Sequence, residues 1–249
     1  ILSTSQPPYQ DCVYLGKVGL LGGMVNENED SKLLAQDRQN IERGSAPATS
    51  GTHASEKPLY DVFISHVGED KESIAIPLYD ELTLLGIYPF LDKKEFRTGK
   101  YMPDDMIQAM ETARCGVFIL SPDFVAREWP MKELRCFLHR YQDAKNKGHA
   151  PPLLVPVFHR LTPSDCRMTP QAFFSKYESH FTAEENGFLR RIVAKETTIE
   201  QIMEDLQALQ QLECLPEVER REHDYRLIHK VAQTVHEEAK KWEAIGLNP

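Results

Sequence analysis

The stretch YDVFISHVGED, residues 60–70, joins a short apolar run to a polar loop. Its first five residues, YDVFI, are mostly β-branched or aromatic, which favours a buried strand. A helical pattern follows over about 71–85, where apolar residues recur every three or four positions and Gly86 closes the pattern. A strand that leads directly into a helix is the first half of a βαβ unit.

The same alternation continues along the chain. Apolar runs at 87–91, 116–120 and 153–158 predict three further strands, with helices over 104–113 and about 126–143. Pro89 within the second run favours a position at the sheet edge or a distortion of the strand. Strands alternating with helices at this spacing predict right-handed crossovers and a parallel sheet. The predicted fold class is therefore α/β, although no clear fifth strand is visible.

The segments on either side have a different character. Residues 1–57 are rich in Ser, Gln, Asn, Gly and Pro, which predicts a disordered or poorly ordered N-terminal tail. Two further helices are predicted at 198–213 and 218–243. Their apolar stripes are expected to cover the sheet, with a partner-binding coiled coil as the alternative. The predicted domain spans 58–245, including this extra helical C-terminal part.

Composition narrows the classes of partner. Apolar residues make up 41% of the 249 residues, enough for a sizeable core, and the formal charge of −9 does not favour nucleic acid. No apolar run approaches the roughly 20 residues that span a membrane, so no membrane partner is expected. Five widely spaced cysteines without a CxxC motif suggest a reducing, cytoplasmic location. The nine histidines form no HExxH or Cys/His cluster, so no metal site is expected.

The polar segments that follow the predicted strands point to one site. In open parallel sheets, ligands bind just beyond the carboxyl ends of the strands. The first three strands are followed by SHVGED (65–70), DKKEFRTGKYM (92–102) and SPDFVAREW (121–129). Six side chains should therefore lie at one end of the sheet: Ser65, His66, Asp92, Ser121, Trp129 and Glu133. The first loop, with Gly68, leads into a helix N-terminus that can bind an anion, and the second adds three lysines and an arginine.

Glu133 permits two interpretations. The helix over 126–143 has a regular apolar stripe, and Glu133 lies roughly 90° from it, on the rim of the buried face. An acidic residue after Pro130 near a helix start is favoured by the helix dipole alone. The functional interpretation is a carboxylate that faces a ligand, largely exposed, kept ionised by the helix N-terminus and shielded from water by Trp129. The residues alone leave both open.

Taken together, these segments resemble the Toll/interleukin-1 receptor (TIR) domain family. The resemblance runs from about Leu59 to Phe181, through YDVFISHVGED, FLDKKEFRTGK, ARCGVFILSPDFVAREWPMKEL and VPVFHRLTPSDCR. It implies a flavodoxin-like fold with helices on both faces of the sheet. TPSDCR and LYDELTLLGI resemble the plant branch, and we expect a TIR-only protein or a fragment. FLDKKEFRTGKY and the W-x-x-x-E motif also resemble the animal NAD hydrolase of axon degeneration.

The resemblance also implies roles for individual residues. The catalytic glutamate of the family falls on Glu133, and the aromatic residue that stacks on the substrate falls on Tyr101. The predicted contacts to NAD⁺ are Ser65, His66, Val67, Gly68, Glu69, Asp70, Asp92, Gly99, Lys100, Tyr101, Ser121 and Trp129. The sequence departs from the family pattern at Val67, where an arginine is usual, and at Pro130, where plant members usually have cysteine.

One carboxylate is chemically sufficient for the implied reaction. Nicotinamide leaves NAD⁺ as a neutral molecule and needs no general acid, so the developing oxocarbenium-like ribose is what remains to be stabilised. The predicted function is an NAD⁺ nucleosidase in immune or cell-death signalling that yields ADP-ribose or a cyclic variant. NAD⁺ is then substrate rather than cofactor, and the expected protein partners are further copies or other TIR domains. The alternative is a non-catalytic TIR adaptor.

Overall fold

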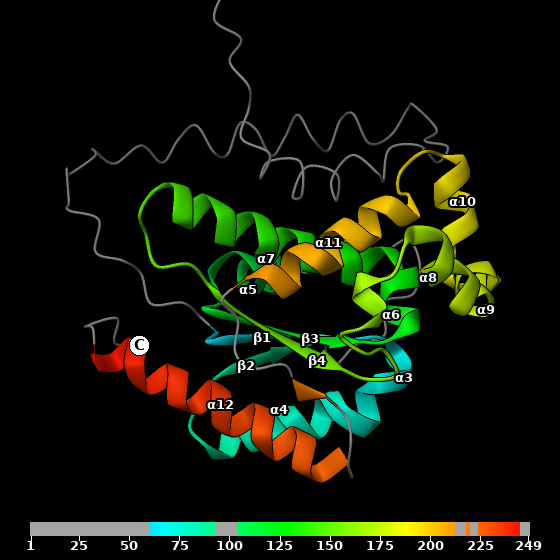
Figure 1. Cartoon of the computed structure of the whole chain (residues 1–249). Coiled ribbons are helices and arrows are strands. Elements are labelled where there is room, and N and C mark those ends of the chain that lie inside the picture. Colours follow the sequence, from blue (N-terminus) through cyan, green and yellow to red (C-terminus); the bar gives the residue numbers. More distant parts are fainter. Residues whose placement is uncertain (1–59, 93–103, 213–217, 220–223, 245–249) are drawn as a thin grey trace, which may run out of the picture.

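The computed structural model describes residues 60–92, 104–212, 218–219 and 224–244 (Figure 1). The predicted tail, residues 1–57, lies outside the described residues. Three predicted substrate contacts, Gly99, Lys100 and Tyr101, lie outside them as well.

The sheet has five parallel strands. They are β1 (Val62–Ser65), β2 (Pro89–Leu91), β3 (Cys115–Leu120), β4 (Leu153–Phe158) and β5 (Val218–Glu219), in the order β2-β1-β3-β4-β5. This is the flavodoxin-like order, which confirms the predicted fold class. The edge position expected for the strand that contains Pro89 is also confirmed.

Helices cover both faces of the sheet, as Figure 1 shows. Helices α4 (Ile76–Leu84) and α12 (Asp224–Ala244) pack against each other on one face. On the other face lie α5 (Asp104–Thr112), α7 (Glu128–Asn146) and α11 (Ile199–Gln211). The apolar stripes of α11 and α12 are buried in the two cores, so the prediction that these helices cover the sheet is confirmed.

The connections at the carboxyl ends of the strands are short helical segments. After β1 the chain enters α3 (Gly68–Asp70) and a π-helical segment (Lys71–Ala75) before α4. The helical structure therefore begins three residues earlier than predicted. After β3 comes α6 (Pro122–Ala126), and after β4 a 3₁₀ turn (Asp165–Arg167). Then follow α8 (Pro170–Lys176), α9 (Glu178–Thr182), a second 3₁₀ turn (Glu184–Asn186) and α10 (Phe188–Val193). Figure 1 shows α3, α6, α8, α9 and α10 at the same end of the sheet.

The predicted helix over 218–243 was wrong at its start. Val218 and Glu219 form β5, which pairs with Val157 and Phe158 of β4, and the helix begins at Asp224. A strand of two residues is too short to show the alternation that distinguishes strands from helices in a sequence. The fifth strand was therefore hidden inside a segment whose later part is helical.

Gly116 is required by a close approach of two aromatic rings. A β-carbon at this position of β3 would lie 2.8 Å from the ring of Phe118 and 2.9 Å from that of Phe137, and both rings are fully buried. We therefore expect Gly116→Ala to lower the free energy of unfolding by about 1–3 kcal/mol, the usual cost of overpacking. Urea unfolding measures this change. Gly68→Ala is the control, since a β-carbon there meets nothing within 4 Å, and equal urea midpoints for the two variants would contradict the assignment.

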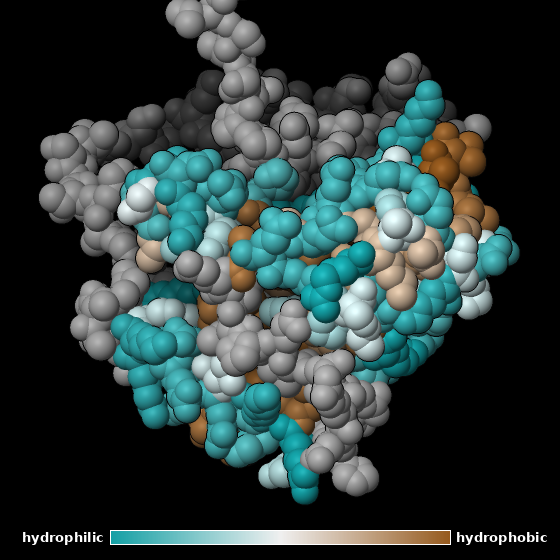
Figure 2. Space-filling view, viewed as in Figure 1, coloured by the Kyte–Doolittle hydropathy of each residue, from teal (hydrophilic) through white to brown (hydrophobic). Residues whose placement is uncertain are grey.

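The visible surface is mostly hydrophilic, and its most prominent hydrophobic patch lies at the upper right (Figure 2). The patch lies over α10, where Leu189, Ile192 and Val193 are exposed. Within the described ranges, none of the helices has the length and apolar character needed to cross a membrane.

Candidate active site

Glu133 and Ser65 are in direct contact at the centre of the candidate site. Ser65 is the last residue of β1, and its hydroxyl donates a hydrogen bond to Oε2 of Glu133 on α7. Both residues are buried, with 6% of Glu133 and 1% of Ser65 exposed. Two predicted site residues that lie 68 positions apart in the sequence are thus joined by the packing of α7 on β1.

The expectation of an exposed, ionised Glu133 was wrong. Burial raises the pKa of Glu133 to about 8, the hydrogen bond from Ser65 opposes this rise, and the negative charge of Asp92 adds to it. Glu133 is the sixth residue of α7, and the dipole effect fades beyond the first helical turn. Glu133 lies on the rim of its own helix, but β1 covers that rim. The carboxyl group is therefore mainly protonated at pH 7.

Asp92 and His66 complete a group of four side chains. Asp92 follows β2 and acts electrostatically on both Glu133 and His66. Burial lowers the pKa of His66, a hydrogen bond to the Val67 carbonyl opposes this, and nearby Lys71 lowers it further. Nδ1 of His66 donates that bond over 2.9 Å, so the neutral ring carries its proton there. Four side chains thus lie together at the carboxyl end of the sheet, as predicted from the sequence: Ser65, His66, Asp92 and Glu133.

The remaining residues of the first loop differ in their exposure to solvent. Val67 is buried in the core, whereas Gly68 and Glu69 are exposed. Asp70 is completely buried and turns away from solvent. Of the predicted nucleotide contacts in this loop beyond His66, only Gly68 and Glu69 are therefore open to a ligand in this conformation.

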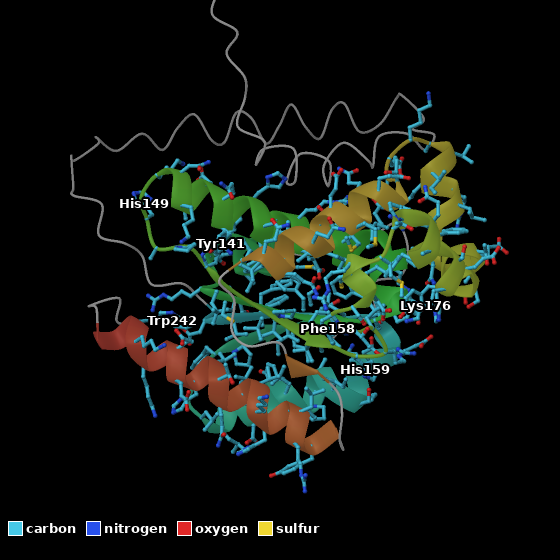
Figure 3. The ribbon with its side chains drawn as sticks, viewed as in Figure 1. Tyr141, His149, Phe158, His159, Lys176 and Trp242 are labelled. Carbon is cyan, nitrogen blue, oxygen red and sulfur yellow. The ribbon has the colours of Figure 1, made fainter. Side chains whose placement is uncertain are left out.

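Asp70 joins the ends of three strands. Its carboxylate accepts a hydrogen bond from Ser121 after β3 (2.8 Å), contacts Nε2 of His159 after β4 (3.2 Å) and forms an ion pair with Arg160 (2.6 Å). Figure 3 places His159 beside α3, at the end opposite to Trp242 and Tyr141. Burial by itself would raise the pKa of Asp70, but the bonds from His159 and Ser121 and the charge of Arg160 hold it below its usual value. Ser121, a predicted substrate contact, is fully buried in this network.

Two members of this network, His159 and Arg160, were missed from the sequence. They directly follow β4, so the rule applied to the first three strands would have found them. Arg160 has a left-handed backbone (φ 62°), which is uncommon for a residue other than glycine. Its guanidinium also contacts Glu69 (3.4 Å) and Asp123 (3.9 Å). Arg160 therefore brings a cation to the carboxyl end of the sheet. Val67, at the same end, occupies the position where an arginine is usual in the family.

A second buried network holds α6 and α9 together. Asp123 accepts hydrogen bonds from His180 (2.9 Å) and Asn186 (3.1 Å), and Nε of Arg127 donates to Asn186 (2.7 Å). Burial would raise the pKa of Asp123, but these two bonds and the charges of His180 and Arg127 lower it. The sequence carried no signal for this network, because its members come from segments about 60 positions apart without a shared pattern.

Trp129 is partly exposed at the start of α7. The residue is 41% exposed, and Nζ of Lys132 lies 5.0 Å from the centroid of its ring. Its role as a shield for Glu133 stays a prediction. Across the part of the chain that the structure describes, there is no group of three or more His, Cys, Asp and Glu side chains arranged to hold a metal ion.

Comparison with known proteins identifies the family. The family model described as "TIR domain" matches residues 62–192, more than half of the chain, from the start of β1 into α10. This chain belongs to the TIR domain family.

The relatives that the chain matches include proteins from bacteria and plants. It is 29% identical to the "2' cyclic ADP-D-ribose synthase AbTIR" of Acinetobacter baumannii, covering 51% of this chain and 45% of that protein. It is 31% identical to the "NAD(+) hydrolase TirS" of Staphylococcus aureus, covering 64% and 56%. It is 32% identical to the "Disease resistance protein RUN1" of Vitis rotundifolia, covering 46% and 8%. The chain spans about half the length of the two bacterial relatives.

Proposed function

We propose that this chain is an NAD⁺ nucleosidase that cleaves the bond between nicotinamide and ribose. The observation that carries the proposal is the buried carboxyl group of Glu133, held by Ser65 at the carboxyl end of a parallel sheet. Burying an ionisable group near a second carboxylate, Asp92, destabilises a fold. An adaptor gains nothing from that cost. Several relatives are named NAD(+) hydrolases or 2' cyclic ADP-D-ribose synthases.

The proposed chemistry uses Glu133 in its ionised form. As the bond to nicotinamide breaks, positive charge develops on the ribose, and a carboxylate held close to it stabilises that charge most strongly where water is excluded. The pyridinium ring of NAD⁺ is itself a cation, so its arrival favours ionisation of Glu133. Water then attacks the ribose to give ADP-ribose, or a group of the same nucleotide attacks to give a cyclic product.

The wider setting is also part of the proposal. The segments TPSDCR and LYDELTLLGI support the plant-type branch, with a role in immune or cell-death signalling. The buried cysteines Cys115, Cys136 and Cys166 are compatible with the cytoplasm. The proposed partners are NAD⁺ and further TIR domains.

The exposed apolar patch on α10, Leu189, Ile192 and Val193, favours protein contact and is the observation that supports the adaptor as a second candidate.

The deciding experiment is incubation of the purified protein with NAD⁺. We expect nicotinamide to be released in a one-to-one ratio with ADP-ribose or a cyclic product, separated by chromatography. A matched pair of variants excludes a contaminating activity. Glu133→Gln should be inactive, whereas Glu128→Gln, on the same helix but half-buried and paired with Lys132, should be active. Intact NAD⁺ together with self-association would support the adaptor instead.

The reaction should depend on pH through Glu133. Only the ionised carboxylate is active, and the pKa of Glu133 is about 8 in the free protein, so kcat/KM should rise about tenfold between pH 7 and pH 9. The pKa of His66 is lowered from 6.5, so its ring is neutral throughout this range and adds no step. Because bound NAD⁺ favours the carboxylate, kcat should reach its half-maximum at a lower pH than kcat/KM. A kcat/KM that is constant from pH 6 to pH 9 would contradict this assignment.

A further inference from the structure

The hydroxyl of Ser65 has a partner that its place in the first loop did not suggest. The resemblance to TIR domains predicted a contact with the nucleotide, yet the hydroxyl donates to Oε2 of Glu133 and only 1% of Ser65 is exposed. A serine buried to this extent has little surface left for a substrate. Its hydroxyl acts on the reaction through Glu133.

The hydrogen bond from Ser65 stabilises the ionised form of Glu133 more than the protonated form. A hydroxyl that donates to a carboxylate makes a charge-assisted bond, about twice as strong as one between neutral groups. The burial of Glu133 and the negative charge of Asp92 act in the opposite direction, because both disfavour the carboxylate. The balance between Ser65 and Asp92 therefore governs how much of the carboxylate is present.

Other ionisable groups lie on the elements around α7, and none of them is a cause of the raised pKa of Glu133. Asp205 of α11 pairs with Arg135, and Asp123 of α6 bonds to His180. Glu111 lies in the last turn of α5. His66, next to Ser65, is directed by its Nδ1 proton to the carbonyl of Val67. Among the described residues, Ser65 and Asp92 are thus the groups that act on the carboxyl group of Glu133.

We propose that Ser65 is a positioning residue for Glu133: its hydroxyl fixes the orientation of the carboxyl group and favours the carboxylate, against the opposing charge of Asp92. This inference rests on the proposed function for its effect on catalysis. Its effect on the ionisation of Glu133 does not depend on that function. The two parts are therefore tested with separate readouts.

The first readout is the ionisation of Glu133 itself, without NAD⁺. Infrared difference spectra between the unmodified protein and Glu133→Gln isolate the protonated carboxyl band of Glu133, and its loss with rising pH gives a midpoint. Ser65→Ala should raise this midpoint by about one pH unit, since one charge-assisted bond is lost. Asp92→Asn should lower it, because the neighbouring negative charge is removed. Shifts of opposite sign are a result that general loosening of the site does not produce.

The second readout is the pH profile of nicotinamide release. Ser65→Ala should lower kcat about tenfold at pH 7 and shift the half-maximum of kcat/KM upward, and Ser65→Thr should restore the midpoint because it retains the hydroxyl. Ser121→Ala is the matched control. Ser121 is also a buried serine at a strand end bonded to a buried carboxylate, but its partner is Asp70, so the infrared midpoint of Glu133 should stay unchanged in this variant.

The outcomes separate the two proposals. If the unmodified protein releases no nicotinamide, the proposed function fails, while the infrared midpoints still test Ser65. If Ser65→Ala keeps the infrared midpoint of the unmodified protein, the inference about Ser65 is overturned, whatever the protein does with NAD⁺. Melting curves of each variant verify that the fold is retained. If Ser65→Ala does not fold, Ser65→Thr and Asp92→Asn provide the test. The inference about Ser65 is overturned if Ser65→Thr shifts the infrared midpoint of Glu133 as much as Asp92→Asn does, or more.

Discussion

Glu133→Gln is expected to become more stable than the unmodified protein as it loses activity. Removing the carboxylate should reduce nicotinamide release at least a hundredfold, which is the scale observed when a single group that stabilises transition-state charge is lost. The gain in stability has a separate cause. The pKa of Glu133 is 4.5 when exposed and about 8 in the folded protein, so folding binds the proton more tightly.

The sign of the pH dependence follows from that difference. Between pH 4.5 and 8 the unfolded chain releases a proton that the folded protein retains, so the free energy of unfolding falls as pH rises through this range and remains low above it. Glutamine does not titrate. The contribution of the buried amide to the free energy of unfolding does not change with pH. The stability of Glu133→Gln relative to the unmodified protein should therefore increase by about 4 kcal/mol from pH 5 to pH 9.

Thermal unfolding at several pH values measures this effect. At about 2–4 °C per kcal/mol for a domain of this size, the difference in melting temperature should grow by about 10 °C over that range. Glu128→Gln is the control, because its side chain is half-buried and paired with Lys132, and it should show no such trend. A constant difference between Glu133→Gln and the unmodified protein would mean that Glu133 is ionised in the folded state.

Asp70→Asn should be the most destabilising of the conservative changes at this end of the sheet. The substitution leaves the guanidinium of Arg160 without its closest carboxylate and brings an amide donor towards His159 and Ser121. Removing one partner from a buried charged network costs about 3–5 kcal/mol. Glu69→Gln is the matched control on the adjacent residue, since Glu69 is exposed and lies 3.4 Å from Arg160, and it should cost less than about 1 kcal/mol.

The pH dependence of the Asp70 effect has the opposite sign to that of Glu133. The pKa of Asp70 is lowered from 3.8 by folding, so its contribution is fully present above pH 3.8 and is lost as pH falls through the lower pKa of the folded state. The stability gap between Asp70→Asn and the unmodified protein should therefore narrow in acid. Urea unfolding at pH 7 and pH 3 measures the gap, and equal gaps at both pH values would rule out an ionised, buried Asp70.

The longer strands were predictable because both of their faces are buried, which gives a continuous apolar run, and the helices because one buried face gives a regular apolar stripe. β4 was predicted with its observed bounds, 153–158, and α11 to within two residues. β5 was not predictable in the same way. Its two residues carry no period, and their pairing with β4 is decided by the rest of the fold.

The site was predictable to the extent that topology determines it. The rule that ligand groups follow parallel strands brought Ser65, Asp92 and Glu133 together correctly. It could not give the environment of each group, because the burial of Glu133 depends on how α7 lies on β1, a contact across 68 positions. The inward turn of Asp70 likewise depends on His159 and Arg160, which are about 90 positions away.

The two edges of the sheet have a consequence for how copies of this chain can join. β2 has three residues, the first of them Pro89 without an N–H group, and β5 has two. Within the described residues, each edge thus offers very few backbone groups to a strand from another molecule, so growth of the sheet through β2 or β5 is disfavoured. We expect copies that assemble to meet through side chains on helices and loops, contacts that separate more readily than the backbone ladder of a fibre.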